Sequence, residues 1–124
     1  MIVLDAGPLI GLDRNDRRVI ALLARAVETG TPVVVPATAL AQAVRQPARQ
    51  ARLARLLRQP GTIVDDLDRV AATSVGRLLA NTGTTDIADA HVVVAARRSA
   101  ATTVVTSDAG DLRRLDDNVH LTAV

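Results

Sequence analysis

Residues 1–10 of the chain read MIVLDAGPLI, in which four apolar residues are followed by Asp5 and, two positions on, by Gly7. A short apolar run that ends at turn-forming residues predicts a strand buried on both faces of a sheet. Two runs of the same kind follow along the chain, at Pro32–Val35 and Thr102–Thr106. These three segments predict a sheet that is covered on both sides.

Segments with helical spacing of apolar residues separate these strands. The clearest is Arg17–Thr29, and Gly30 follows it as a C-cap. The same spacing, with capping residues, predicts further helices at Thr38–Gln46, Ala48–Arg58, Asp66–Ala80, Asp86–Ser99 (capped by Thr84 or Thr85) and Asp111–Leu115, and short strands at Thr62–Val64 and Val119–Val124. Gly7 and Gly11 are interpreted as turn residues. Alternating strands and helices predict an α/β fold with a central, mostly parallel sheet flanked by helices.

The composition sets the class of the protein. A chain of 124 residues fits one domain, and an apolar content of 48% is typical of a folded chain. No apolar stretch reaches the roughly 20 residues that a membrane helix needs, and the N-terminus lacks the basic lead of a signal peptide. There is no cysteine for a disulfide framework. We expect a single domain, 1–124, in the cytoplasm and with no membrane association.

The chain lacks lysine and aromatic residues, and this restricts the kinds of catalysis and ligand binding that are open to it. All 15 basic residues are arginines, so no lysine can form a Schiff base or serve in a phosphate-binding P-loop. The chain also has no Phe, Tyr or Trp, which excludes binding of single strands by aromatic stacking. The net charge of +2 does not by itself indicate a nucleic-acid binder, although arginine suits bidentate contacts to phosphate.

Aspartates stand where an α/β sheet binds its ligands. Asp5 and Asp108 each follow a predicted strand, and the carboxyl ends of parallel strands meet at one edge of a sheet. Asp86 and Asp89 lie three residues apart at the start of one predicted helix, so they share a face. Acidic residues are also common at helix starts, where they interact with the helix dipole. Spacing alone therefore leaves a structural interpretation of this pair open.

The surroundings of Asp5 and Asp89 favour a bound cation. Both stand among apolar residues, and burying carboxylates together costs free energy through desolvation and repulsion. No arginine lies near either residue in the sequence. Ligand sets made only of oxygen favour Mg²⁺ or Mn²⁺ over zinc, and such an ion can activate water and stabilise charge on a phosphodiester. We therefore expect a Mg²⁺ or Mn²⁺ site.

Three strings carry a resemblance to a known family. MIVLDAGPLI resembles the opening of PIN domains, in which an Asp ends the first strand, while TTDIADAHVVVAA and VVTSDAGDL are similar to the PIN motifs that hold the third and fourth acidic positions. They occur in the family's order over essentially the whole chain, whose size resembles VapC-type toxins. The resemblance implies a metal-dependent endoribonuclease that hydrolyses RNA and is held inactive by a cognate antitoxin that covers the acidic site. It also implies a protein that often forms a homodimer.

Carried over residue by residue, the resemblance assigns catalytic and metal-binding roles to Asp5, Asp89 and Asp108. It makes Asp86 an auxiliary ligand, and Thr106 and Ser107 hydroxyls that can orient Asp108. The second acidic position departs from the family, because PATALAQAVRQ offers Gln42 where PIN domains usually place Glu. An amide oxygen brings no charge, so this departure weakens the expected metal affinity and puts the activity in question.

Other polar residues admit plainer interpretations. Arginines run along the two helices after the second strand, either as a solvated helix face or as a track for the RNA backbone, with Arg45 and Arg49 as candidates. His91 falls off the face that Asp86 and Asp89 share, so we expect it to pack in the core, and His120 to be structural. Caps and solvated turn residues are expected at Asp65, Asp66, Asp68, Asp116 and Asp117.

Competing functions are less consistent with the sequence. A receiver or a haloacid-dehalogenase-like domain would also place an Asp after the first strand. Both need a lysine near the phosphoryl group, and the dehalogenase type needs a second Asp where Gly7 stands. No helix-turn-helix signal supports DNA binding. The remaining alternative is a PIN-like module, weakened at Gln42, that binds RNA or a protein without cutting.

Overall fold

The apolar run at the N-terminus forms the central strand of the sheet. In the computed structural model, which describes all of residues 1–124, β1 (Ile2–Leu4) pairs in parallel with β2 (Val33–Pro36) and with β4 (Thr103–Thr106). At one edge β3 (Thr62–Asp65) pairs in parallel with β2, and at the other edge β5 (Leu121–Ala123) pairs in parallel with β4. The strand order is therefore β3-β2-β1-β4-β5. The α/β class and the parallel sheet are confirmed.

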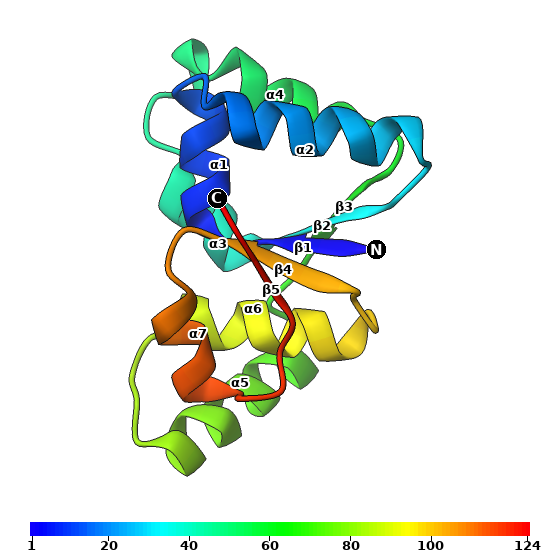
Figure 1. The fold of residues 1–124 in the computed structure, drawn as a ribbon. Coiled ribbons are helices and arrows are strands. Elements are labelled where there is room, and N and C mark those ends of the chain that lie inside the picture. The colour runs from blue at the N-terminus through cyan, green and yellow to red at the C-terminus, as the bar shows by residue number, and fades with distance from the viewer.

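Helices cover both faces of the sheet (Figure 1). One layer holds α1 (Ala6–Asp13), α2 (Arg17–Glu28) and α4 (Ala51–Arg58), and the other holds α5 (Arg69–Thr82), α6 (Ile87–Arg98) and α7 (Ala109–Leu115). Between them, α3 (Ala37–Ala43) packs against both α1 and α6, and a 3₁₀ turn at Pro47–Arg49 leads into α4. Covering both faces explains why the inner strands are continuous apolar runs rather than alternating ones.

The core lies on both sides of the sheet, and α6 is its most deeply buried helix. Ala90, His91 and Val92–Ala95 are all buried, because α6 is packed between the sheet and α5. A helix that is apolar on nearly every side is typical of such a position. Both ends of the helix reach the surface: Asp86 and Asp89 stand at its start, and Arg97 and Arg98 stand at its end.

The first helix was not predicted from the sequence. Gly7 and Gly11, interpreted as turn residues, both lie inside α1, which begins directly after β1. Asp5 is its N-cap, since its Oδ1 accepts a hydrogen bond from the amide of Ala6 (2.8 Å). Two glycines and a proline in eight residues give a poor helical signal, and tertiary packing overrides it.

Two predicted caps stand at the wrong residues. Asp68, not Asp66, caps α5, and Asp86 itself caps α6, where Thr84 or Thr85 was expected. In both helices the carboxylate accepts from the amide three positions on, at 2.8 and 3.0 Å. A carboxylate at this position also interacts favourably with the helix dipole, which a threonine hydroxyl does not match.

The prediction for the helix after β2 was also wrong in part. Thr38 does not cap it, because α3 begins immediately after Pro36 and ends at Ala43 rather than at Gln46. The Thr38 hydroxyl is instead bonded to the ring of His91. Thr38 is the second residue of α3 and so does not stand at the cap position, and its hydroxyl makes a tertiary contact instead.

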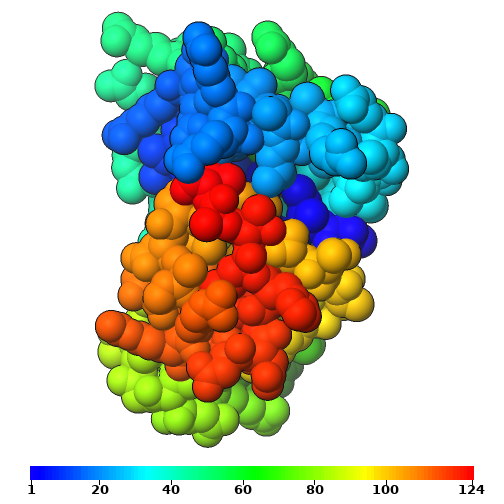
Figure 2. Space-filling view, viewed as in Figure 1, coloured from blue at the N-terminus to red at the C-terminus, as the bar shows by residue number.

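The charges divide between the two halves of the chain. Residues 1–58 carry nine arginines and four acidic residues, whereas residues 59–124 carry six arginines and nine aspartates. The first half supplies the layer of α1, α2 and α4, and the second half supplies that of α5, α6 and α7 (Figure 1). On the face shown in Figure 2, β5 and the C-terminus lie between the two layers.

No helix combines the length and the apolar character needed to cross a bilayer.

Candidate functional site

Asp5 is fixed at the end of the central strand. It is 8% exposed, and both carboxylate oxygens are engaged: Oδ1 accepts from the Ala6 amide and Oδ2 from the Thr106 hydroxyl, each at 2.8 Å. Chain order reverses between β1 and β4, since β2 and β3 follow on one side of β1 and β4 and β5 on the other. Parallel sheets bind ligands at such a switch point, so Asp5 lies where the topology predicts a site.

Thr106 connects Asp5 to the loop that carries Asp108. Its side chain is fully buried, and its hydroxyl donates to Asp5 while accepting from the backbone amide of Asp108 at 2.9 Å. A hydroxyl has one proton and two lone pairs, so both bonds can form at once. Thr106 thus holds the Asp5 carboxylate and the Asp108 backbone in one arrangement.

Gly7 lets this loop approach α1 closely. A Cβ atom at Gly7 would lie 2.5 Å from Oγ and 2.8 Å from Cβ of Ser107, which is closer than side chains pack. The missing side chain therefore makes room for Ser107, next to Asp108. Ser107 itself is exposed and makes no side-chain hydrogen bond to Asp108.

Asp86 and Asp89 form the second part of the acidic group, at the start of α6. Asp86 is exposed and its Oδ1 accepts from the Asp89 amide (3.0 Å), whereas the Asp89 side chain is free and half-buried. Helix capping alone thus accounts for an aspartate at position 86, and no further role is needed to explain it. Capping does not explain Asp89, whose carboxylate has no bonded partner in the protein.

Asp111 joins this group, although it was not predicted from the sequence. A cavity of about 240 Å³ beside α6 is lined by Asp86, Asp89 and Asp111, together with Thr84, Thr85, Arg114 and Leu115. Asp111 follows Asp108 at the same spacing as Asp89 follows Asp86. That repeated spacing was the available signal.

The electrostatics of the group are those of crowded carboxylates. Burial first, and then the nearby charges of Asp86, Asp5, Asp111 and Asp108, together raise the pKa of Asp89 to about 7. Burial also raises the pKa of Asp5, although its hydrogen bonds from Thr106 and Ala6 oppose the rise. In both residues the cost of ionisation comes first from desolvation and then from repulsion.

No arginine forms an ion pair with any of the four predicted ligands. The arginine ion pairs of the structure involve other aspartates, Asp16, Asp68, Asp111 and Asp116, while Asp5, Asp86, Asp89 and Asp108 have none. Such a group, built only of oxygen donors, has the charge and the chemistry that Mg²⁺ or Mn²⁺ requires. The residues present therefore fit a divalent cation.

The carboxylates do not form a closed cage. No three His, Asp or Glu side chains converge closely enough to hold an ion as they stand. Mg²⁺ usually keeps several of its waters and is held by only one or two carboxylates. The open arrangement thus suits an ion that is shared between protein, water and substrate.

Gln42 and the two candidate arginines lie on and after α3. Gln42 is exposed and has no hydrogen-bond partner in the protein. One turn away, Arg45 folds back so that its Nη1 donates to the carbonyls of Ala41 (2.9 Å) and Val44 (2.7 Å). Arg45 is thus engaged at the end of α3, whereas Arg49 is exposed in the 3₁₀ turn.

His91 is buried in the core, as expected, but its ring also makes hydrogen bonds to two other elements. Its Nδ1 lies 2.8 Å from the Thr38 hydroxyl and its Nε2 lies 3.0 Å from Oδ2 of Asp65. Asp65, interpreted as a turn residue, is the last residue of β3. This chain of hydrogen bonds joins α3, α6 and β3, so it holds the helix that carries Asp89 against its neighbours.

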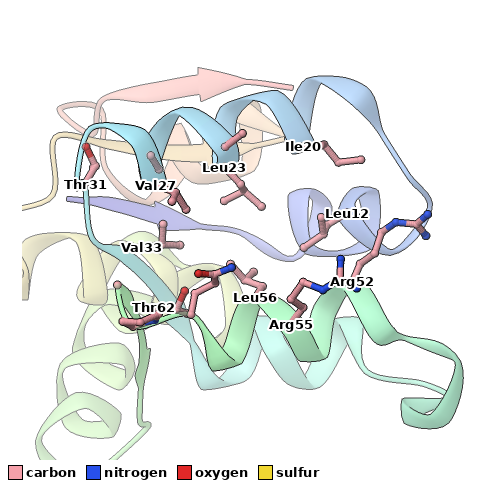
Figure 3. Close-up of a pocket in the computed structure, with 16 residues that line it drawn as sticks. Leu12, Ile20, Leu23, Val27, Thr31, Val33, Arg52, Arg55, Leu56 and Thr62 are labelled. Atoms are coloured by element: carbon pink, nitrogen blue, oxygen red, sulfur yellow. The ribbon is translucent and has the colours of Figure 1, made fainter.

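A second surface feature lies away from the carboxylates. A groove of about 610 Å³ runs between α2 and α4 (Figure 3). Leu12, Leu23 and Leu56 line it, and Arg52 and Arg55 of α4 contribute the charge. Arg52 and Arg55 therefore line this groove and not the cavity beside Asp89.

Comparison with known proteins gives one family. A sequence model described as "PIN domain" matches residues 2–118. No protein of curated function matches the chain.

Solved structures of low sequence identity share the fold. VapBC2 from Rickettsia felis, bound to a DNA fragment from its promoter, matches with a TM-score of 0.70 and 17% identity over 100% of this chain and 99% of that one. FitAcB from Neisseria gonorrhoeae matches with a TM-score of 0.64 and 21% identity over 98% of this chain and 96% of that one. FitAB bound to an IR36 DNA fragment matches with a TM-score of 0.67 and 17% identity over 99% of this chain and 94% of that one.

Proposed function

The chain belongs to the PIN domain family, and on that premise we propose that it is a metal-dependent endoribonuclease, the toxin of a toxin–antitoxin pair. PIN domains are typically metal-dependent nucleases. The observation that carries the proposal is a group of carboxylates near the β1/β4 switch point that form no ion pair with an arginine: Asp5, Asp86, Asp89 and Asp108.

The protein's own residues prepare this group for a cation. Asp5, Asp89 and Asp108 would hold Mg²⁺ or Mn²⁺, with Asp86 as an auxiliary ligand. When bound, such an ion polarises a phosphodiester and makes a coordinated water more acidic. Thr106 keeps the Asp5 carboxylate in place. Asp89, with a pKa of about 7, gives up its proton near neutral pH and is then free to ligate.

A second candidate function is RNA or protein binding without cleavage. It is favoured by Gln42, which brings no charge where PIN domains usually have Glu. Loss of one carboxylate lowers metal affinity, and the remaining aspartates decide whether activity survives. The two functions differ in one measurable property, which is cleavage.

A cognate antitoxin is the proposed protein partner. Two structures that share the fold, VapBC2 from Rickettsia felis and FitAB, are each bound to a DNA fragment. For this chain we propose that the antitoxin places an amphipathic, acidic segment in the α2/α4 groove, where apolar walls meet Arg52 and Arg55. A homodimer stays a prediction, to be checked by light scattering of the purified chain.

Cleavage of RNA by the purified protein tests the main proposal. We expect cleavage that requires Mg²⁺ or Mn²⁺ and stops with EDTA, with Asp5→Asn and with Asp89→Asn. Asp117→Asn is the matched control, because Asp117 is exposed and has no bonded partner. Cleavage that persists in both site variants contradicts the proposal, and binding without cleavage supports the second candidate.

Growth of cells that express the chain alone tests the toxin role. Arrest by the wild type but not by the Asp5→Asn/Asp89→Asn double variant supports it. Equal arrest by both would show that the carboxylates are not the cause.

A further inference from the structure

The cavity beside Asp89 contains one positive charge. Arg114 of α7 lines it together with three carboxylates, those of Asp86, Asp89 and Asp111. Its Nη1 lies 3.9 Å from Oδ1 of Asp111, beyond hydrogen-bond distance, and 77% of its side chain is exposed. An exposed pair of this kind contributes little to stability, so the guanidinium is free to bind another anion.

We propose that Arg114 binds a backbone phosphate of the RNA substrate beside the candidate metal centre. The inference rests on the proposed function and adds a residue to it. A wall of carboxylates repels a polyanion, so an RNA chain that enters needs a positive partner there. Without lysine or aromatic residues, arginine alone can provide that contact, and its planar group suits phosphate.

The competing interpretation is a solvated helix residue that only balances the charge of Asp111. Arg113, the preceding residue of α7, distinguishes the two. Arg113 is exposed, as Arg114 is, but it does not line the cavity and makes no ion pair. Replacing either arginine by Gln removes the same charge from the same helix, and only one replacement changes the cavity.

Binding of a fluorescein-labelled single-stranded RNA of mixed sequence is measured by anisotropy at several salt concentrations, with Ca²⁺ to limit cleavage. We expect Arg114→Gln to weaken binding roughly fivefold. The salt dependence of log K should lose a slope of about 0.7, the value for one phosphate contact on a single strand. Arg113→Gln should keep wild-type affinity and slope, and Arg114→Lys should recover the slope.

Mn²⁺ titration of the same variants separates this proposal from a folding defect. Removing a positive charge from the cavity should leave Mn²⁺ affinity unchanged or raise it, so the affinities for RNA and metal change in different directions. Equal RNA affinities of Arg114→Gln and Arg113→Gln overturn the proposal, as does a joint loss of RNA and Mn²⁺ binding. Failure of the wild type to bind RNA at all would instead contradict the proposed function.

Discussion

The hydroxyl of Thr106 and the carboxylate of Asp5 are 101 positions apart in the sequence and 2.8 Å apart in the structure. Each stands at or just after the carboxyl end of its strand, and the two strands are neighbours at the switch point of the sheet. The bond forms only when the parallel pairing is complete. The candidate site is therefore assembled by the same register that forms the core.

Thr106→Val tests what this bond contributes. Valine keeps the shape but leaves Asp5 Oδ2 and the Asp108 amide without their partner. An unsatisfied buried group costs about 1–3 kcal/mol, so the free energy of unfolding, measured in urea, should fall by that amount. The affinity for Mn²⁺ should fall with it. Thr102→Val, at an exposed threonine without side-chain bonds, should change neither quantity.

Gly7→Ala tests the close approach of α1 to the Ser107 loop. The new methyl group would lie 2.5 Å from Ser107 Oγ, so the loop that carries Asp108 must shift. We expect a loss of about 1–3 kcal/mol in unfolding free energy, typical of overpacking, together with weaker Mn²⁺ binding.

Two controls accompany this change. Gly76→Ala, inside α5 with no atom within 4 Å of the added Cβ, should stabilise the protein by about 0.5–1 kcal/mol. The double variant Gly7→Ala/Ser107→Gly removes the clashing side chain and should regain part of the loss. If Gly7→Ala were as harmless as Gly76→Ala, the contact would not matter.

The raised pKa of Asp89 gives a pH dependence of stability. Its ordinary value is 3.8 and its folded value is about 7. Between about pH 4 and about pH 7 the unfolded chain ionises first, so the free energy of unfolding of the metal-free protein should fall as pH rises. Denaturation in urea across this range, with EDTA present, measures the slope.

Asp89→Asn removes the ionisation and should flatten this part of the profile, so the variant should be more stable than the wild type above about pH 7. Added Mn²⁺ should stabilise the wild type but not the variant. A profile that Asp89→Asn leaves unchanged would place the titrating group elsewhere.

The strands and most helices follow from the sequence because their signals are local. Buried apolar runs mark β1, β2 and β4, and regular spacing marks α2 and α6. The carboxyl edge of the sheet is then fixed by topology, so Asp5 and Asp108 could be placed at one edge. Asp89 was found by its apolar surroundings, a signal that survives in the structure as its raised pKa.

The missed features depend on contacts between distant segments. The helix α1 has a weak local signal, and its glycine is explained only by Ser107, 100 positions away. The role of Thr38 depends on His91, and Asp111 joins the site only because α7 packs against α6. Of these features only Asp111 leaves a pattern in the sequence, its three-residue spacing from Asp108; the pairings of Gly7 and Thr38 leave none.

Gln42→Glu tests how far the missing carboxylate limits the site. α3 packs against α1, which Asp5 caps, and against α6, which carries Asp89. The resemblance to PIN domains assigns this position to the site, so a carboxylate there is expected to add negative charge to a group that has no arginine ion pair. We expect it to tighten Mn²⁺ binding by roughly tenfold, the equivalent of about 1.4 kcal/mol, as measured by calorimetry at neutral pH.

Gln46→Glu is the matched control, since Gln46 is exposed and lies beyond the end of α3. The same charge there should change Mn²⁺ affinity much less, because it acts only through solvent. Without metal, Gln42→Glu should also destabilise the protein at neutral pH by repelling the other carboxylates, and Mn²⁺ should reverse that loss. An increase in affinity that both variants share would reflect net charge alone. If Gln42→Glu gains RNA cleavage that the wild type lacks, the amide at this position is what separates a binding module from a nuclease.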